Sequence, residues 1–192
     1  MIIGIAGRMR SGKTTLAKVL VERYGFHKSS FAGAVRDEVA DAMFKGRVNA
    51  REQLLLAEVR DKNAVRPILQ AWGEGKRNLI HPDYWIWKMF EESAHHDLVV
   101  VDDVRYPNEV SAILDSGGFL VRLEVSDETI VDRGGKLDAL NHPSEMGILE
   151  ITDAERSAKS RVITVNTDGR SDYGLWKAVK KQLEMWIDDN RK

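Results

Sequence analysis

Cysteine is absent from this chain of 192 residues, and its charges are nearly balanced. Without cysteine there can be no disulfide, no zinc–thiolate site and no thiol nucleophile. The 29 Lys and Arg residues against 30 Asp and Glu give a formal net charge of -1. The sequence therefore lacks the general positive charge that is typical of nucleic-acid-binding proteins, although a local basic site is compatible with it. We expect no nucleic-acid partner.

Long hydrophobic runs are also absent. No apolar stretch approaches the length of a membrane span, and Gly7 and Arg8 interrupt the apolar N-terminus too early for a signal peptide. We therefore expect no membrane partner and, by default, a cytoplasmic location. Hydrophobic residues at 43% and charged residues at 31% are typical of a globular protein, and the length predicts one domain over residues 1–192.

The chain opens with Met1-Ile2-Ile3-Gly4-Ile5-Ala6-Gly7-Arg8-Met9-Arg10-Ser11-Gly12-Lys13-Thr14. Gly7, Gly12, Lys13 and Thr14 fill the G-x-x-x-x-G-K-[ST] pattern of a phosphate-binding loop, with an apolar strand before it and helical spacing after it. Backbone N–H groups of such a loop and the following helix dipole attract phosphate oxygens. Lys13 is expected to reach the β- and γ-phosphates of ATP, and Thr14 to bind Mg²⁺. Arg10, Ser11 and Thr15 complete the predicted ATP-binding loop.

Alternating strands and helices predict an α/β fold. Apolar or alternating runs predict strands over residues 1–6, 98–101, 119–125 and 162–165, and the short, mixed segment 26–31 is interpreted as a second strand. Helical spacing predicts helices over 14–24, 35–43, 84–90, after Pro107, from Tyr173, and from Arg51 with a restart at Pro67 that Gly73 and Gly75 end. Residues 126–160 are polar and predict a lid or binding insert. The expected architecture is a three-layer P-loop NTPase fold, with a central parallel sheet flanked by helices.

Two aspartates directly follow the predicted strand Leu98–Val101. A phosphate-binding loop needs a carboxylate at the end of another strand to hold Mg²⁺, and Asp102 and Asp103 occupy that place. Both faces of this apolar strand should be buried, so strand parity does not choose between them. Arg105 lies two residues further on, where ligands of open α/β sheets bind, and its guanidinium could clamp a substrate phosphate. The simpler alternative for Arg105 is a surface arginine.

At this point the ordered segments carry a resemblance. Asp103-Val104-Arg105-Tyr106-Pro107-Asn108-Glu109 resembles the D-V-R-[FY]-x-N-E segment of the phage-type deoxynucleoside monophosphate kinases, which belong to the P-loop kinase superfamily. Other segments are similar to the same family in the same order: Tyr24-Gly25-Phe26 with Ser30-Phe31-Ala32, Leu69-Gln70-Ala71-Trp72-Gly73-Glu74-Gly75-Lys76-Arg77, His142-Pro143-Ser144-Glu145 and Asn166-Thr167-Asp168-Gly169. The resemblance runs from residue 1 to about residue 180.

The resemblance implies transfer of the ATP γ-phosphoryl group to a deoxynucleoside 5′-monophosphate with Mg²⁺. It also implies pairing as a homodimer and, for a phage-encoded protein, the host cytoplasm as location. The chain departs from the kinase pattern in its lid, where Arg133 and Lys136 are the only cations between Ser126 and Leu140. Kinase lids usually bring arginines onto the transferring phosphoryl group.

A second set of residues is expected to hold the acceptor nucleotide. Arg36, Arg77 and Arg105 would bind its phosphate, with Arg36 on a solvated helix face as an equal alternative. Gln70 would contact base edges and Trp72 would stack on the base, although aromatic residues at helical spacing are more often core. His142 and Glu145 could order the lid, contact substrate or cap a helix through Ser144, and the sequence leaves this open.

Three other functions compete with this interpretation. Another small-molecule P-loop kinase, such as a dephospho-coenzyme A kinase, shares the opening loop. A non-catalytic nucleotide-binding module would bind ATP without acceptor-dependent turnover. A GTPase is disfavoured, because neither Asp102-Asp103-Val104-Arg105 nor Asn166-Thr167-Asp168-Gly169 supplies its D-x-x-G or N-K-x-D motif. No general base stands out, and a phosphate oxygen needs none because it is already a nucleophile.

Overall fold

A computed structural model describes residues 1–45, 47–136 and 152–191 of the chain. These residues form two compact units, which are described separately. Met1–Ser29 and His96–Lys192 form the first, here called the sheet unit, and Ser30–His95 form the second, the helical unit. The prediction of one domain with a lid insert stays a prediction. His142 and Glu145 lie outside the described residues.

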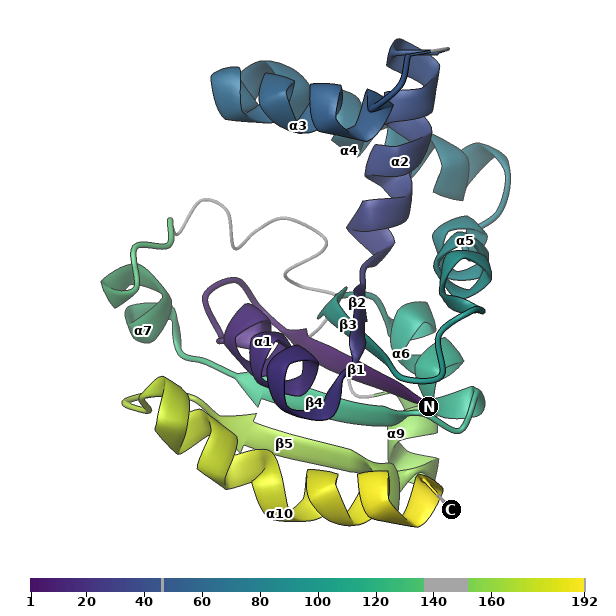
Figure 1. Ribbon diagram of the computed structural model, residues 1–192. Helices are drawn as coiled ribbons and strands as arrows, with labels where there is room; N and C mark the ends of the chain where they lie inside the picture. The colour runs from purple at the N-terminus through teal and green to yellow at the C-terminus, as the bar shows by residue number, and fades with distance from the viewer. Residues whose placement is uncertain (46, 137–151, 192) are drawn as a thin grey trace. The chain divides into compact units, whose positions relative to one another are not determined.

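A five-stranded parallel sheet forms the centre of the sheet unit (Figure 1). The strands are β1 (Ile2–Gly7), β2 (His27–Ser29), β3 (Val99–Val104), β4 (Phe119–Glu124) and β5 (Val162–Asn166). Their order in the sheet is β2-β3-β1-β4-β5, and every neighbouring pair is parallel. β1 is therefore the central strand, and all five strands end at the same edge of the sheet. The predicted fold class is confirmed.

Helices cover both faces of this sheet. α1 (Lys13–Tyr24) and α10 (Asp172–Asn190) pack on one face, while α6 (Pro107–Asp115) packs on the other and contacts α9 (Asp153–Ser157). The face under α1 and α10 forms the main core, because apolar side chains of the strands and of both helices meet there; these include Ile3, Ile5, Leu16, Leu20, Val121, Leu123, Val179 and Leu183. Two shorter helical segments, α7 (Asp127–Asp132) and η3 (Lys159–Arg161), follow β4 and α9.

A buried ion pair joins β4 to α9. Arg122 and Glu155 are 5% and 4% exposed, and Arg122 Nε and Nη2 donate to Glu155 Oε1 and Oε2 at 2.8 Å each. Glu155 also accepts a bond from Thr152 N, which caps α9. The alternation over residues 119–125 predicts one partly polar face on this strand. In the structure α9 covers this face at Arg122. The bidentate pair with Glu155 offsets the desolvation cost of burying both charged side chains.

The helical unit consists of α2 (Phe31–Met43), α3 (Ala50–Arg60), α4 (Lys62–Leu79) and α5 (Tyr84–Ser93). The prediction of a helix start at Pro67 and an end at Gly73 and Gly75 is wrong, since α4 runs through all three residues. The side chain of Asp61 caps the helix by accepting bonds from Asn63 N and Ala64 N. Gly73 lies at a close contact, where its carbonyl accepts a bond from Trp85 Nε1 at 2.9 Å.

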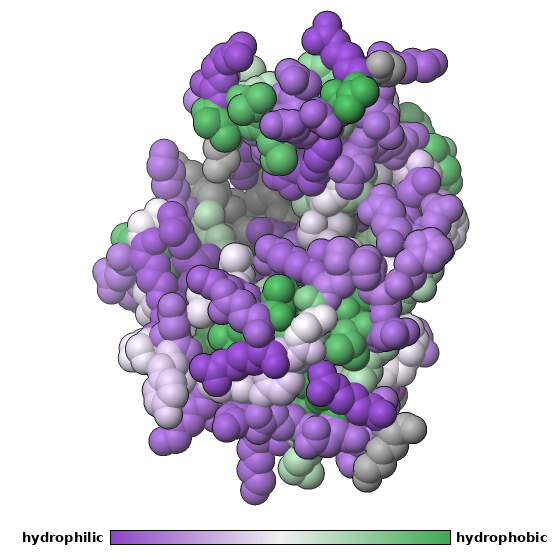
Figure 2. Space-filling model, viewed as in Figure 1, coloured by the Kyte–Doolittle hydropathy of each residue, from purple (hydrophilic) through white to green (hydrophobic). Residues whose placement is uncertain are grey.

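Hydrophobic side chains reach the surface of the helical unit over α3 (Figure 2). Leu55, Leu56 and Val59 are all exposed there, and Val59 is 86% exposed. Exposed apolar side chains on one helix are candidates for contact with another protein. Within the described part of the chain, none of the helices is long and apolar enough to cross a membrane.

Packing between α1 and α10 generates a prediction about alkaline pH. Tyr24 Oη donates to Glu184 Oε1 at 2.5 Å, and burial, followed by this bond, raises the pKa of Tyr24 to about 12. The folded state thus holds the phenol proton more tightly than the unfolded chain, whose pKa is about 10. The stabilisation is complete below pH 10 and is lost as the pH rises to 12. Tyr24→Phe should cost about 1 kcal/mol at pH 8 and flatten the loss of stability above pH 10.

Urea unfolding at pH 8, 10 and 11.5 measures this. Tyr173→Phe is the matched control, because Tyr173 is 73% exposed, and it should change stability little at any of the three pH values. Equal pH profiles for Tyr24→Phe and the unchanged chain would contradict the assignment.

Candidate functional site

The loop between β1 and α1 depends on glycine at both ends. Gly7 has φ 151° and Gly12 has φ 95°, backbone conformations that strain any residue with a Cβ. A Cβ at Gly7 would lie 2.6 Å from Leu123 O and 2.7 Å from Ser11 Oγ, and one at Gly12 would lie 2.9 Å from Leu175 Cδ2. At Gly7 the loop therefore packs against the backbone of β4 closely enough to exclude a side chain, whereas at Gly12 the positive φ is what favours glycine.

The side chain of Lys13 folds back onto the start of the loop. Its side chain is 8% exposed, and Nζ donates to Gly7 O and Arg8 O at 2.6 Å each. These carbonyls hold the ammonium group at the mouth of the loop, where phosphate oxygens can replace them as acceptors. Ser11 is fully buried, and its Oγ has no hydrogen-bond partner among the described residues. A buried hydroxyl without a partner in a phosphate-binding loop fits a bound phosphate group.

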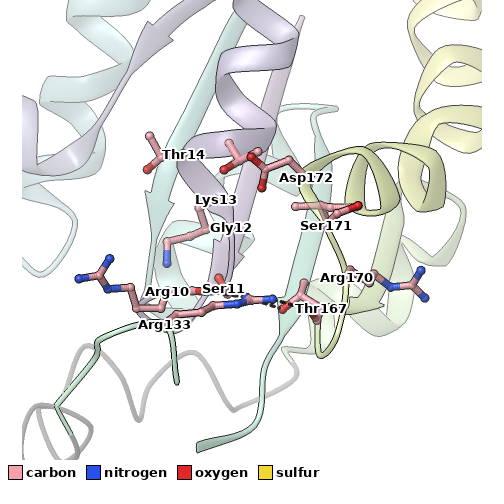
Figure 3. Close-up of a pocket in the computed structure, with 12 residues that line it drawn as sticks. Arg10, Ser11, Gly12, Lys13, Thr14, Arg133, Thr167, Arg170, Ser171 and Asp172 are labelled. Carbon is pink, nitrogen blue, oxygen red and sulfur yellow. Dashed lines mark hydrogen bonds between the residues drawn. The ribbon is translucent and has the colours of Figure 1, made fainter. Parts of the chain in front are cut away.

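A cavity of about 490 Å³ lies directly over this loop (Figure 3). Its lining comes from the loop and the start of α1, from the end of α7, and from the connection between β5 and α10: Arg10, Ser11, Gly12, Lys13, Thr14, Thr15, Arg133, Thr167, Arg170, Ser171, Asp172 and Leu175. Four cations and one carboxylate make the lining strongly electropositive. Such a cavity suits the phosphates of a nucleotide.

Arg133 joins three parts of this site. Its Nη1 donates to Arg10 O at 2.9 Å and its Nη2 to Thr167 O at 2.7 Å. Asp168 adds a second tie, since its carboxylate accepts a bond from Ser126 N at 3.0 Å. This bond, together with one to Thr129, holds the pKa of Asp168 below its ordinary value. The β5–α10 connection is thereby attached both to the loop and to the start of α7.

Asp102 and Asp103 lie within β3, so the prediction that they follow the strand is wrong. Gly4 pairs with Val101 and Ala6 with Val104, which leaves Ile5 opposite both aspartates. This two-against-one register is a β-bulge. Because the bulge interrupts the alternation of side chains, the two aspartates need not face opposite sides of the sheet. β3 neighbours β1, so both carboxylates lie at the sheet edge where the loop begins.

The two aspartates differ in their surroundings. Asp102 is 8% exposed, and Lys28 Nζ of β2 lies 2.8 Å from its Oδ2. Asp103 is partly exposed. The Thr14 hydroxyl and an aspartate carboxylate are the hard oxygen ligands that Mg²⁺ prefers, so the residues present fit this ion. In the described ranges, no three His, Asp or Glu side chains gather into a ready-made metal site.

Arg105 follows β3 at the start of α6. Its backbone N–H donates to Glu109 Oε2 at 2.8 Å, and that of Tyr106 donates to the same oxygen at 3.1 Å. Glu109 is 1% exposed, and its carboxylate caps the start of α6 by accepting these two bonds. Arg105 itself is half-buried at the edge where β1 and β3 end.

The other acceptor candidates belong to the helical unit. Arg36 forms a bidentate pair with Glu58, at 3.1 Å from Nε and 3.0 Å from Nη2. Gln70, Trp72 and Arg77 all lie on α4, and the indole Nε1 of Trp72 is buried without a partner among the described residues. Each role stays a prediction.

Lys76 of α4 is a residue that the sequence did not single out. Its Nζ lies 2.5 Å from Glu38 Oε1 and over the rings of Trp72 and Tyr84, at 5.6 and 4.9 Å from their centroids. It thus joins α2, α4 and α5 beside Trp72.

Sequence reasoning also missed Thr167, Arg170, Ser171 and Asp172 on the donor side. Their position directly after the last strand could have predicted a binding role, because ligands of parallel sheets bind at the carboxyl ends of strands.

A parallel sheet whose central strand ends in this loop, under an electropositive cavity, defines a P-loop nucleotide-binding protein. The family model for the AAA domain matches residues 3–145. The chain belongs to this family.

Two viral proteins are similar to the chain in sequence. A protein of Acanthamoeba polyphaga mimivirus named "Putative deoxynucleotide monophosphate kinase" is 27% identical over 170 residues, which cover 79% of this chain and 83% of that protein. "Uncharacterized protein ORF76" of Ictalurid herpesvirus 1 (strain Auburn) is 31% identical over 128 residues, covering 63% of this chain and 47% of that protein. The family match and the mimiviral relative confirm the resemblance to deoxynucleoside monophosphate kinases of the P-loop superfamily.

Two solved structures are similar in fold. Shikimate kinase from Aquifex aeolicus vf5 has a TM-score of 0.48 at 16% identity, over 99% of this chain and 98% of that chain. Shikimate kinase from Bacteroides thetaiotaomicron has a TM-score of 0.45 at 17% identity, over 97% and 98%.

Gly7→Ala tests the close packing of the loop. The new methyl group would meet the backbone of β4, so we expect a loss of about 2–4 kcal/mol in unfolding free energy from strain and overpacking, together with loss of ATP binding. Gly25→Ala is the matched control, because Gly25 also has a positive φ of 74° but has nothing within 4 Å of a Cβ. It should cost only about 1 kcal/mol and leave ATP affinity unchanged.

Urea unfolding and titration with a non-hydrolysable ATP analogue measure both effects. Equal losses in the two variants would mean that backbone conformation alone, and not contact with β4, makes Gly7 necessary.

Proposed function

We propose that the chain transfers the γ-phosphoryl group of ATP, with Mg²⁺, to a deoxynucleoside or nucleoside 5′-monophosphate. The observation that carries the proposal is the electropositive cavity over the phosphate loop, lined by Lys13, Arg10, Arg133 and Arg170. The name of the mimiviral relative and the ordered segments around Gln70 and Arg105 support a monophosphate acceptor.

In the donor half, the loop N–H groups and Lys13 bind the β- and γ-phosphates of ATP. The β5–α10 connection lies at the end of the cavity away from Lys13, and it binds the nucleoside part of ATP. Thr14 and Asp103 would hold Mg²⁺, directly or through water, and the ion would neutralise negative charge on the phosphates. Asp102 is paired with Lys28 of β2, so Asp103 is the carboxylate that we assign to the ion.

In the reaction, an oxygen of the acceptor phosphate attacks the γ-phosphorus, and the bond to the bridging β–γ oxygen breaks, which releases ADP. The attacking oxygen is already anionic, so no side chain has to remove a proton. Catalysis then depends on positioning and charge neutralisation.

In the acceptor half, Arg105, Arg77 and Arg36 bind the monophosphate, and Gln70 and Trp72 contact the base. Arg36 has to exchange Glu58 for the substrate phosphate to do so. His142 and Glu145 complete the proposed substrate site. A homodimer, with the exposed side chains of α3 as a candidate contact, and a location in the (host) cytoplasm complete the proposal.

An acceptor panel tests the function. Release of ADP from Mg-ATP is measured with each ribo- and deoxynucleoside monophosphate, with dephospho-coenzyme A, and with no acceptor. We expect stimulation by one or more nucleoside monophosphates, and loss of this stimulation in Lys13→Ala by at least about 10²-fold. Arg105→Ala should raise the acceptor KM or lower kcat while leaving the ATP KM unchanged.

Other outcomes of the panel point elsewhere. Stimulation by dephospho-coenzyme A alone would identify another small-molecule kinase. Tight ATP binding with equal rates for every acceptor and for none would sink the kinase proposal and favour a nucleotide-binding module.

The two aspartates can be separated by their effect on Mg²⁺. Asp103→Asn should raise the Mg²⁺ concentration needed for half-maximal turnover and weaken Mg²⁺-dependent ADP binding by about 10- to 100-fold. Asp102→Asn removes the partner of Lys28 and should mainly lower thermal stability. The reverse pattern would assign the metal to Asp102.

A further inference from the structure

Arg10 adopts a backbone conformation that side chains other than glycine rarely adopt. Its φ is 60°, and Asn49 is the other non-glycine residue with positive φ in the described ranges. The left-handed conformation costs an arginine about 1 kcal/mol. Strain of this kind is tolerated where the side chain has a task at the site. Glycine would fill this position without the cost, so the presence of arginine indicates a task for the guanidinium group.

Three neighbouring arginines are occupied by the protein itself. Arg8 donates to Val125 O at 2.8 Å and to Asp127 Oδ1 at 2.6 Å. Arg133 donates to the carbonyls of Arg10 and Thr167. Arg170 Nε donates to Asn166 O at 2.7 Å. These three guanidinium groups hold backbone in place, which reduces what they can offer to a substrate.

Arg10 differs from these three. Its side chain is exposed, and its Nη2 approaches Gly134 O at 3.5 Å, which is the outer limit of a hydrogen bond. Its own carbonyl is fixed by Arg133 at 2.9 Å. The backbone of Arg10 is therefore held firmly while its guanidinium group can move to a ligand at little cost.

The direction of the Arg10 side chain indicates which end of a bound nucleotide it can reach. In Figure 3 the guanidinium of Arg10 and the ammonium of Lys13 project to the same side of the cavity, and Arg170 projects to the opposite side. Lys13 marks the β/γ-phosphate end by its place in the motif. Arg10 therefore projects toward the γ-phosphate end.

We propose that Arg10 is a catalytic residue of the loop, whose guanidinium binds the transferring γ-phosphoryl group more tightly in the transition state than in bound ATP. This inference rests on the proposed function. Arg10 donates N–H bonds to the equatorial oxygens while the bond to the bridging oxygen breaks and the bond to the acceptor oxygen forms, and no proton leaves the guanidinium. It supplies charge that kinase lids usually contribute, because Arg133, one of the two cations between Ser126 and Leu140, holds backbone carbonyls.

Arg10→Gly is a clean test, because glycine removes the guanidinium and also relieves the strain. Thermal stability should stay equal or rise. The value of kcat should fall by about 10³-fold, the lower range for a phosphoryl-binding arginine, while the affinity for ATP changes by less than about threefold. Arg10→Asn, which also tolerates a positive φ, should give the same loss of kcat.

A binding measurement separates this role from general phosphate binding. MgADP with aluminium fluoride and the accepted monophosphate mimics the transferring phosphoryl group. Calorimetry should show tight binding of this mixture by the unchanged chain and a loss of at least about 10²-fold in Arg10→Gly, with MgADP affinity retained. Asn49→Gly is the control for replacing a left-handed residue, and it should alter stability only.

The outcomes are distinguishable from failure of the proposed function. If the unchanged chain shows no acceptor-dependent turnover, both proposals fall. If it turns over and Arg10→Gly does so at the same rate, or loses ATP affinity in proportion to kcat, the role of Arg10 is wrong while the kinase stands.

Discussion

Close approach of the β1 backbone to β4 is the constraint on which the candidate site depends. At Gly7 the carbonyl of Leu123 would lie 2.6 Å from any Cβ, so the chain can turn into the loop only through glycine. The loop that follows this turn leads directly into α1, which packs on the sheet. The main core lies on the same face, formed by α1, α10 and the strands. The packing that stabilises the sheet unit therefore also shapes the loop.

Charge around the loop divides into two kinds. Arg8 bonds to Val125 O and Asp127 and so joins the loop to the start of α7, and Arg133 bonds to the carbonyls of Arg10 and Thr167 and so joins the loop to the β5–α10 connection. Arg170 bonds to Asn166 O within that connection. Lys13 also bonds to carbonyls, but to those of the loop mouth itself, which a phosphate can displace. Such an arrangement keeps an electropositive cavity rigid, because the fixed cations hold its walls together and the remaining ones face the cavity.

Local pattern predicted much of the sheet unit. The apolar or alternating runs of β1, β3, β4 and β5, Gly25 at the end of α1 and Pro107 at the start of α6 are local signals, and the phosphate loop is a contiguous motif. Predictions failed where packing overrode local preference. α4 continues through Pro67 and Gly73 because a cap at Asp61 and contact with Trp85 offset the weaker helix propensity. Arg122 is buried because Glu155, 33 residues away, pairs with it.

The sequence by itself determined the α/β class and the phosphate loop, because each is carried by neighbouring residues. Only the tertiary structure decided how these parts serve one site. The bulge opposite Ile5 depends on the register between β1 and β3. The wall formed by Arg133, Thr167 and Arg170 depends on strand order, which brings the end of β5 to the edge where β1 ends. Register and order arise from contacts between residues far apart in the chain, and no local pattern contains them.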